Sequence, residues 1–282
     1  MGMRHIRAAR LVHGVEISGI VDLDSSMRVR LQGDGHLVWP NLESAFASDS
    51  FDAAIVATPP ASLASIAQAL VLHGVHVLVE KPFVINSLFQ NGTPVCSDDS
   101  PVIVQVGFVE RFARFSGEID RLIYGLDAFP SQPPNQVTLA IRRSSARPQW
   151  HCETDPLRDL ACHDLDHLER NGVTIRSRTM DHSASSVRIL GELWRNGKLL
   201  SRLDALAQWG APAERKWSLN RPNGLSESLR LDASADFGTL WDPLARQLTQ
   251  FRDSCSAHLE RVSLDPMTGL EASQEAENRD RS

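Results

Sequence analysis

Short apolar runs and helical spacings alternate in the first third of the chain. Residues 53–57 (AAIVA) and 75–79 (VHVLV) are runs typical of strands that are buried on both faces. Between them, apolar residues recur at helical spacing, namely Leu63, Ile66, Ala67, Leu70 and Val71. Gly74 follows at the position where a left-handed C-cap is needed. This order predicts two parallel strands joined by a right-handed helical crossover.

The same patterning extends this unit in both directions. It predicts a helix over 4–11, a strand over 15–21, a strand with its turn over 34–41, a helix over 42–48 and a strand over 102–108. The hydrophilic stretch 86–100 is expected to be a loop. Together these elements predict a Rossmann-like α/β domain over residues 1–108.

The remaining residues, 109–282, predict a second domain of a different class. Helices are predicted over 116–124, over 155–168 and after Asp242-Pro243, and strands over 136–143, 187–193 and 198–209, around Trp217 and over 229–233. Asn196-Gly197 is a strong signal for a two-residue hairpin. The sequence therefore predicts an α+β domain with an open, mostly antiparallel sheet.

Composition limits the class of protein. The chain has 282 residues, of which 42% are hydrophobic, and this is enough for two domains with substantial cores. A formal net charge of −6 without a dense basic patch makes nucleic-acid binding a poor default. No apolar run approaches the roughly 18 residues that span a bilayer, and residues 1–5 carry no apolar signal core. The 4 cysteines lack CxxC pairing, which is typical of reduced thiols, so a cytoplasmic enzyme is expected.

Polar residues follow the strands of the first domain. Thr58-Pro59-Pro60 comes after one strand of the central unit and Glu80-Lys81-Pro82 after the other. Ligands of an open parallel sheet bind outside the carboxyl ends of its strands, so these residues are expected to line one crevice. Asp22 ends the strand 15–21, where an acidic residue accepts hydrogen bonds from an adenosine ribose. A strand-end turn residue is an equally good interpretation of Asp22.

Two segments of this unit, AIVATPP and HGVHVLVEKP, resemble the Gfo/Idh/MocA family of nicotinamide-dependent sugar and polyol oxidoreductases. The resemblance extends more loosely over most of the chain. It implies that Lys81 lies between cofactor and substrate, and that Thr58, Pro59 and Glu80 lie at the cofactor site. The alternative is an ordinary nucleotide-binding crossover in which Lys81 is a solvated lysine at a strand end.

The first five residues, MGMRH, resemble the end of the family's glycine-rich loop. Gly2 would then bind cofactor as the third glycine of the G-x-G-x-x-G fingerprint, with the first strand and two glycines absent. Either the chain begins late, which we favour, or it has lost cofactor binding. Because a missing central strand leaves two edges unpaired, we expect lower stability and weaker cofactor binding than in a version extended by that strand.

Residues 106–112, VGFVERF, resemble the VGHxERFNP segment of a family branch that acts on nucleotide-linked amino sugars. Phe108 replaces the histidine, and Ala113-Arg114 replaces Asn-Pro. The resemblance implies that Arg111 binds substrate. Three further arginines are expected either to meet a substrate phosphate or, more often, to lie on a solvated sheet face: Arg142, Arg143 and Arg147.

Residues 155–168 (DPLRDLACHDLDHL) predict a helix that is buried on one side, with Asp155 as its N-cap. At about 100° per residue, Asp159, His163 and Asp166 fall on one face, where they cost free energy unless they are paired or used. The resembled family shows D-x-x-x-H-x-x-D on a helix that faces the nicotinamide. This implies His163 as the acid/base, Asp159 as its partner, and Asp166 as an acceptor for a substrate hydroxyl. Histidine titrates near neutral pH, as a base for a hydroxyl proton should.

Two other interpretations of this helix stay open. In one, it is a structural helix with an N-cap and salt bridges, in which the histidine is hydrogen-bonded. In the other, it contributes to a zinc site. The zinc ligands would come from His151, Cys152, Cys162, His163 and His167. Their spacing fits no common closed pattern and the resembled family uses no metal, so no metal is predicted.

Together these residues predict reversible hydride transfer between NAD(H), or alternatively NADP(H), and a secondary alcohol of a sugar, polyol or nucleotide-sugar. Asp22 favours NAD, because its carboxylate would repel a 2′-phosphate. Members of the resembled family commonly dimerise through the exposed sheet face, so a homo-oligomer, a dimer or tetramer, is expected. The alternative is a catalytically inactive sugar-binding or regulatory relative.

Overall fold

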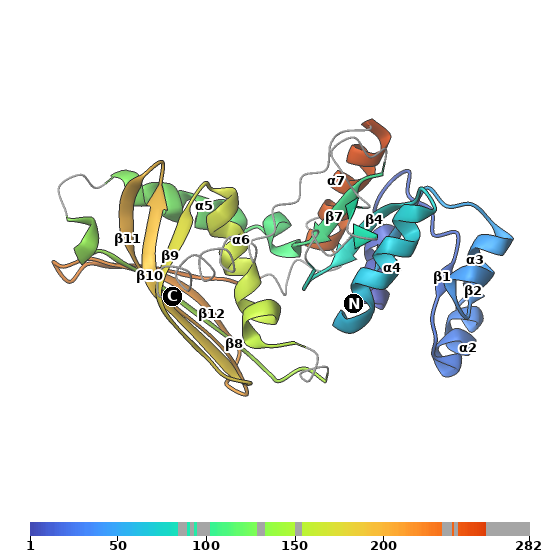
Figure 1. The fold of residues 1–282 in the computed structure, drawn as a ribbon, viewed down its shortest axis with the longest axis horizontal. Coiled ribbons are helices and arrows are strands. Elements are labelled where there is room, and N and C mark those ends of the chain that lie inside the picture. Colours follow the sequence, from blue (N-terminus) through green and yellow to red (C-terminus); the bar gives the residue numbers. More distant parts are fainter. Residues whose placement is uncertain are drawn as a thin grey trace.

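The structure is a computed structural model that describes residues 1–83, 89–90, 93–94, 102–128, 133–149, 154–232, 239 and 242–257. Figure 1 shows a small α/β body beside a long, twisted sheet. The first body contains α1 (Gly2–Ala9), β1 (Ile20–Val21), α2 (Ser25–Gly33), β2 (Val38–Trp39), α3 (Leu42–Ser48), β3 (Ala53–Val56), α4 (Pro60–Leu72), β4 (His76–Glu80), β5 (Phe89–Gln90), β6 (Thr93–Pro94) and β7 (Val104–Gly107).

The central unit forms as its periodicity predicts. β3, β4 and β7 make a parallel sheet in which Val56 pairs with Val79 and Glu80 pairs with Gly107. The helix α4 crosses from β3 to β4, and Gly74 has the positive φ of 74° that ends it. The carboxyl ends of β4 and β7 therefore lie side by side, directly before Lys81 and Phe108.

The predicted strand over 15–21 is wrong in length. Only Ile20 and Val21 pair, as β1, with the parallel strand β2. This pair forms a sheet apart from β3–β4–β7, and among the described residues no strand lies on the other edge of β1. A strand is held by its neighbours, so residues 15–19 have no second ladder to join. The predicted strand over 34–41 is likewise short, because Gly35 turns the chain with a φ of 86° before β2.

The second body is a six-stranded sheet with helices on one face. After η2 (Val109–Phe112) come α5 (Ser116–Gly125), η3 (Leu126–Ala128), η4 (Pro134–Gln136), β8 (Thr138–Ser145), η5 (Leu157–Ala161), α6 (Cys162–Arg170), β9 (Thr174–His182), β10 (Ser186–Arg195), β11 (Lys198–Trp209), β12 (Glu214–Asn220) and β13 (Ser226–Arg230). The strand order is β13-β12-β8-β11-β10-β9, and every pair except β8–β11 is antiparallel. The predicted fold class is thus confirmed. So is the hairpin, in which Asn196 and Gly197 both have positive φ.

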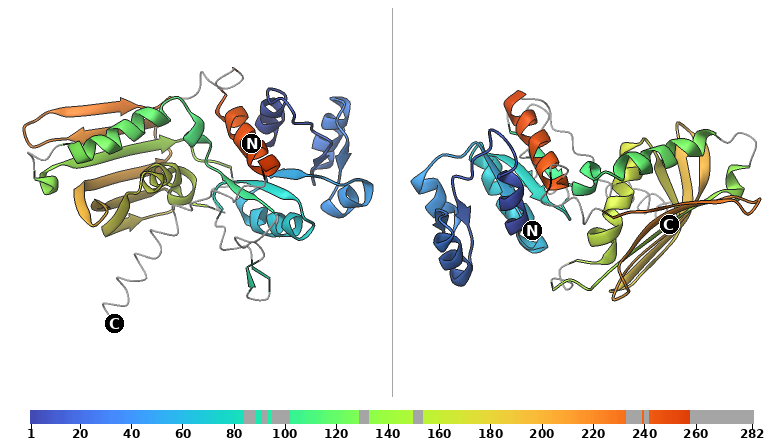
Figure 2. Two further views of the ribbon diagram at one scale, coloured as in Figure 1. Left: turned by 90° about the horizontal axis from the view of Figure 1, so that it is seen from above. Right: turned by 180° about the vertical axis from the view of Figure 1, so that it is seen from behind.

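The helices α5 and α6 cover one face of this sheet, and no described helix covers the other (Figure 2). On the uncovered face, Arg142 donates to the carboxylate of Asp204, which also accepts from Arg188. Arg142 therefore lies in a surface ion network rather than at a substrate phosphate. One buried apolar cluster runs from α4 and β7 through Phe108 and Phe115 to α6 and the sheet, so the two bodies share a core.

The final described helix, α7 (Pro243–Ala257), returns to the first body. Asp242 caps it by accepting from the amide of Leu244 at 2.9 Å. Leu248 and Phe251 bury against Ala8 of α1 and Leu78 of β4. Residues 243–257 thus pack with the first body, although the division at residue 108 assigns them to the second. None of the described helices is long and apolar enough to cross a membrane.

Candidate active site

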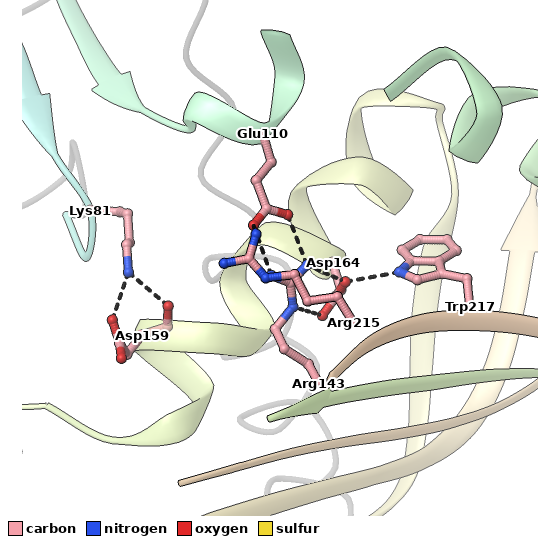
Figure 3. A network of polar contacts seen from close by, with 7 residues as sticks. All are labelled: Lys81, Glu110, Arg143, Asp159, Asp164, Arg215 and Trp217. Atoms are coloured by element: carbon pink, nitrogen blue, oxygen red, sulfur yellow. Dashed lines mark hydrogen bonds and ion pairs between the residues drawn. The ribbon is translucent and has the colours of Figure 1, made fainter. Parts of the chain in front are cut away.

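The site lies where the carboxyl ends of β4 and β7 meet the start of the α6 region. Lys81 follows β4, and its Nζ donates to the Asp159 Oδ1 at 2.6 Å and to the Asp159 carbonyl at 2.7 Å (Figure 3). The indole of Trp209, at the end of β11, donates to the other carboxylate oxygen of Asp159 at 3.3 Å. Asp159 is therefore fixed from both bodies at once.

The helix that carries Asp159 begins as its sequence predicts and then widens. The carboxylate of Asp155 accepts from the amides of Leu157 and Arg158 at 2.8 and 3.0 Å, which confirms the N-cap. The first turn is π-helical, with the Cys162 amide donating to the Leu157 carbonyl, and α6 follows. Such a turn changes the angular offset between Asp159 and His163 from that of a regular α-helix.

The predicted pairing of Asp159 with His163 is replaced by another one. Among the described residues, the Asp159 carboxylate bonds to Lys81 and Trp209, and the Nδ1 of His163 has no partner. The His163 ring lies edge-on to Phe108, with ring centroids 6.2 Å apart. The structure thus brings Lys81 and Asp159 together and sets the buried His163 ring against Phe108.

Burial decides the charge of His163. Desolvation lowers its pKa well below the usual range, and the nearby negative charge of Glu110 only partly offsets this. The expectation that this histidine titrates near neutral pH is therefore wrong: it is neutral there, the form that accepts a proton. Burial also lowers the pKa of Lys81, but the negative charge of Asp159 and the hydrogen bond to its carboxylate act the other way, so the pKa is raised and the ammonium stays charged.

A second pair links the turn after β7 to α6. The guanidinium of Arg111, on η2, donates from Nε to both carboxylate oxygens of Asp166, at 2.8 and 3.0 Å, and from Nη2 to Oδ1. Burial raises the pKa of Asp166, while its bonds with Arg111 act the other way. The two predicted substrate-binding residues thus bind each other, and Arg111 is the more accessible, with 15% of its side chain exposed against 2%.

A buried network of ion pairs and hydrogen bonds lies next to the site, and the sequence did not predict it as part of the site. Arg143 donates to Asp164 and Glu110, Arg215 donates to Glu110 at 3.0 Å, and the Trp217 indole donates to Asp164 at 2.9 Å (Figure 3). Burial raises the pKa of Glu110, but the guanidinium of Arg143, which also donates hydrogen bonds to it, holds that pKa well below its usual range. Arg143 is therefore neither a phosphate ligand nor a solvated residue. The sequence signals for this network were the charged Glu110-Arg111 shortly after a buried strand and Arg143 on a predicted strand.

Several predicted cofactor residues gather at the same sheet edge. His5 of α1 bonds to the buried Glu80 carboxylate, Nε2 to Oε1, at 2.7 Å, and this brings the start of α1 to the end of β4. Neither α1 nor α4 has a side-chain cap, and a Cβ on Gly2 would meet nothing within 4 Å. The N-terminal ends of α1 and α4, at Gly2 and next to Thr58 and Pro59, carry the positive end of the helix dipole, which suits the anionic diphosphate of a dinucleotide.

Asp22 lies in the separate β1–β2 unit. Its carboxylate accepts from the amide of Asp24 at 2.9 Å, which is a turn-residue contact. Arg28 donates to the Asp22 carbonyl at 2.9 Å. The turn interpretation of Asp22 is thus confirmed, and its contact with a ribose stays a prediction.

The described residues hold no group of His, Cys, Asp and Glu that could bind a metal. His167 lies against Phe115 and Trp217 instead, and His151 and Cys152 lie outside the described residues.

A parallel sheet edge that suits a dinucleotide lies beside an ammonium and a neutral histidine, and these are the groups that a nicotinamide-dependent dehydrogenase or reductase acting on CH–OH groups uses. Residues 1–97 match the model of the oxidoreductase family with an NAD-binding Rossmann fold, GFO_IDH_MocA. This match confirms the resemblance of AIVATPP and VLVEKP to the Gfo/Idh/MocA oxidoreductases.

Solved structures share the fold of the whole chain at low identity. The myo-inositol 2-dehydrogenase of Lactobacillus plantarum is 13% identical with a TM-score of 0.74, and the match covers 100% of this chain and 93% of that one. GenD2 from gentamicin A biosynthesis, in complex with NAD, is 19% identical with a TM-score of 0.69 over 97% and 88%. An oxidoreductase of Agrobacterium radiobacter, in complex with NAD+, L-tartaric acid and magnesium, is 16% identical with a TM-score of 0.63 over 96% and 90%. No curated protein matches the sequence of this chain.

Proposed function

We propose that this protein interconverts a secondary alcohol and a ketone on a polyol or sugar, with NAD as its cofactor. The observation that carries the proposal is the Lys81–Asp159 pair beside His163. A charged ammonium from the first body is bound to a carboxylate of the second, near a neutral imidazole, at the edge of a parallel sheet. These are the donor and the base that alcohol oxidation needs.

Each residue has a defined task in the oxidation direction. The neutral His163 imidazole takes the proton of the substrate hydroxyl, while Lys81 Nζ donates to the same oxygen as it becomes a carbonyl. Asp159 holds that ammonium in place and keeps it charged. The nicotinamide, when bound, supplies the hydride acceptor. We assign its binding to Gly2, Asp22, Thr58, Pro59, Glu80 and Lys81.

Hydroxylated substrates suit the second pair of the site. The guanidinium of Arg111 is partly exposed and offers donors to a substrate hydroxyl, while the Asp166 carboxylate anchors Arg111 and offers an acceptor. Proteins of similar structure include a myo-inositol 2-dehydrogenase and an oxidoreductase in complex with L-tartaric acid. Both myo-inositol and L-tartaric acid carry hydroxyl groups on adjacent carbon atoms. We therefore place polyols ahead of nucleotide-sugars as substrates.

A panel assay tests this function. The protein is incubated with NAD and, in turn, with myo-inositol, scyllo-inositol, D-glucose, L-tartrate or a UDP-linked amino sugar, and NADH formation is followed by absorbance. We expect a polyol to be oxidised, and His163→Ala to abolish most of that rate while the exposed control His13→Ala leaves it unchanged. Absence of turnover on every compound, with no NADH fluorescence change on titration, would favour a sugar-binding or regulatory protein instead.

We also propose a homo-oligomer that forms through the uncovered face of the sheet. Light scattering coupled to size-exclusion chromatography gives the mass directly. A monomer at assay concentrations would refute this part of the proposal without affecting the chemistry.

A further inference from the structure

A single buried guanidinium joins the two halves of the candidate site. Arg143, on β8, uses one edge to grip Asp164, with Nε to Oδ2 at 2.7 Å and Nη2 to Oδ1 at 2.8 Å. Its other edge grips Glu110, with Nη1 to Oε1 and Nη2 to Oε2 both at 2.8 Å. Only 3% of Arg143 is exposed, and both carboxylates are buried with it. Figure 3 shows this arrangement, with Arg143 next to both acids.

The two carboxylates lead to different reacting groups. Asp164 directly follows His163 on α6. Glu110 is on η2, three residues after Gly107, and Gly107 pairs with Glu80, the neighbour of Lys81. One side of Arg143 therefore fixes the turn that carries His163, and the other side fixes the strand ends that carry Lys81.

We propose that Arg143 is a positioning residue that sets His163 at its working distance from Lys81 by binding Asp164 and Glu110 at the same time. The proposal rests on the function above, in which Lys81 and His163 act on one substrate oxygen. Reacting groups must be held within a fraction of an ångström, and a misplacement of about 1 Å can cost roughly 10²-fold in rate. A remote contact that fixes this distance therefore influences turnover without touching substrate.

The chemistry of the network favours an arginine in this role. A planar guanidinium binds two carboxylates along two edges, which a lysine ammonium does not reproduce. Arg215 also donates to Glu110, so the two guanidinium charges balance the two carboxylate charges. The Trp217 indole donates a further hydrogen bond to Asp164. Several buried hydrogen bonds thus hold the unit together, as a positioning element requires.

The neighbouring arginine provides a matched control. Arg142 lies on the same strand and also binds an aspartate, but on the uncovered face of the sheet, away from the site. With NAD and the fastest polyol of the panel, we expect Arg143→Lys to lower kcat by about 10–100-fold. The KM for NAD should change by less than about threefold, because Arg143 binds Asp164 and Glu110 and contacts none of the residues that we assign to NAD. Arg142→Lys should leave both constants unchanged.

A second readout does not depend on turnover. The thiol of Cys162, next to His163, is 1% exposed, and burial raises its pKa to about 12, so it alkylates only when this region opens. Iodoacetamide labelling of Cys162, followed by peptide mass spectrometry, should be about tenfold faster in Arg143→Lys and unchanged in Arg142→Lys. If no polyol is oxidised by the unaltered protein, the proposed function fails, and this labelling still tests the hold of Arg143 on α6.

Three results would overturn the proposal. One is a kcat of Arg143→Lys within about threefold of the unaltered protein, whatever the labelling shows. Another is a loss of kcat accompanied by an equal rise in the KM for NAD, which would indicate general loss of structure. If Arg143→Lys does not fold, Glu110→Gln replaces it, because this change loosens only the side towards Lys81. An unaltered kcat in Glu110→Gln is the third overturning result.

Discussion

Acid should destabilise this protein through one histidine that lies outside the reaction. His167 has no exposed surface, and neither ring nitrogen has a hydrogen-bond partner in the structure. Its ring packs against Phe115 and Trp217, with centroids 6.4 and 6.3 Å away. Burial, with the positive charge of Arg170 acting in the same direction, lowers its pKa from 6.5 to about 3.

The sign of the effect follows from proton linkage. The unfolded chain protonates His167 below about pH 6.5, whereas the folded protein holds it neutral down to about pH 3, so acid favours unfolding throughout this window. Each pH unit below 6.5 removes about 1.4 kcal/mol. At pH 5 the loss from His167 alone is about 2 kcal/mol, a substantial part of the roughly 5–15 kcal/mol that holds a domain folded.

Urea unfolding at pH 8 and pH 5 measures this loss. We expect His167→Leu to lose about 2 kcal/mol less than the unaltered protein between the two pH values, because leucine cannot take up a proton. His13→Leu is the control, since His13 is exposed and its change should show the same pH dependence as the unaltered protein. If His167→Leu and the unaltered protein lose equal stability on acidification, His167 is protonated or paired in the folded state and the reasoning fails.

Four further predictions concern the site and the first domain. Lys81→Ala and His163→Ala should each lower turnover by about 10²–10⁴-fold with little change in NAD affinity, and near-normal rates would remove either residue from the mechanism. Because the pKa of His163 is depressed, the rate of alcohol oxidation should persist as pH falls below 6.5; a half-maximal rate at that pH would contradict the burial of His163. NAD should bind more tightly than NADP, and Asp22→Asn should narrow the difference; a lower Kd for NADP than for NAD would refute this. The last prediction concerns a version extended by about 10–15 residues, with two loop glycines and a strand of about six residues that joins β1 to β3. It should have a higher melting temperature and bind NAD more tightly, since each large buried apolar side chain contributes roughly 1.5–3 kcal/mol. Equal melting temperatures and affinities would show that the sheet does not take up such a strand.

Local patterns determined most of the elements. The apolar spacing over 63–71, the N-cap at Asp155 and the dipeptide Asn196-Gly197 each act within a few residues, so helix, cap and hairpin form where the sequence predicts them. The motif around Lys81 likewise places a lysine at a strand end, because strand ends are set by the run of apolar residues before them. The fold class and the location of the candidate site therefore follow from the sequence.

Contacts between distant residues determined the rest. β1 stops at two residues because a strand's length depends on the neighbours that it finds. Asp159 binds Lys81, which lies 78 positions away in the sequence. Arg143 binds Glu110, 33 positions away, on the covered face of the sheet, whereas Arg142 binds Asp204 on the uncovered face. No periodicity distinguishes a solvated arginine from a buried one on an alternating strand. The tertiary structure decides this, because it determines which face of the sheet the helices cover. A charge on the covered face is buried and is costly unless it is paired.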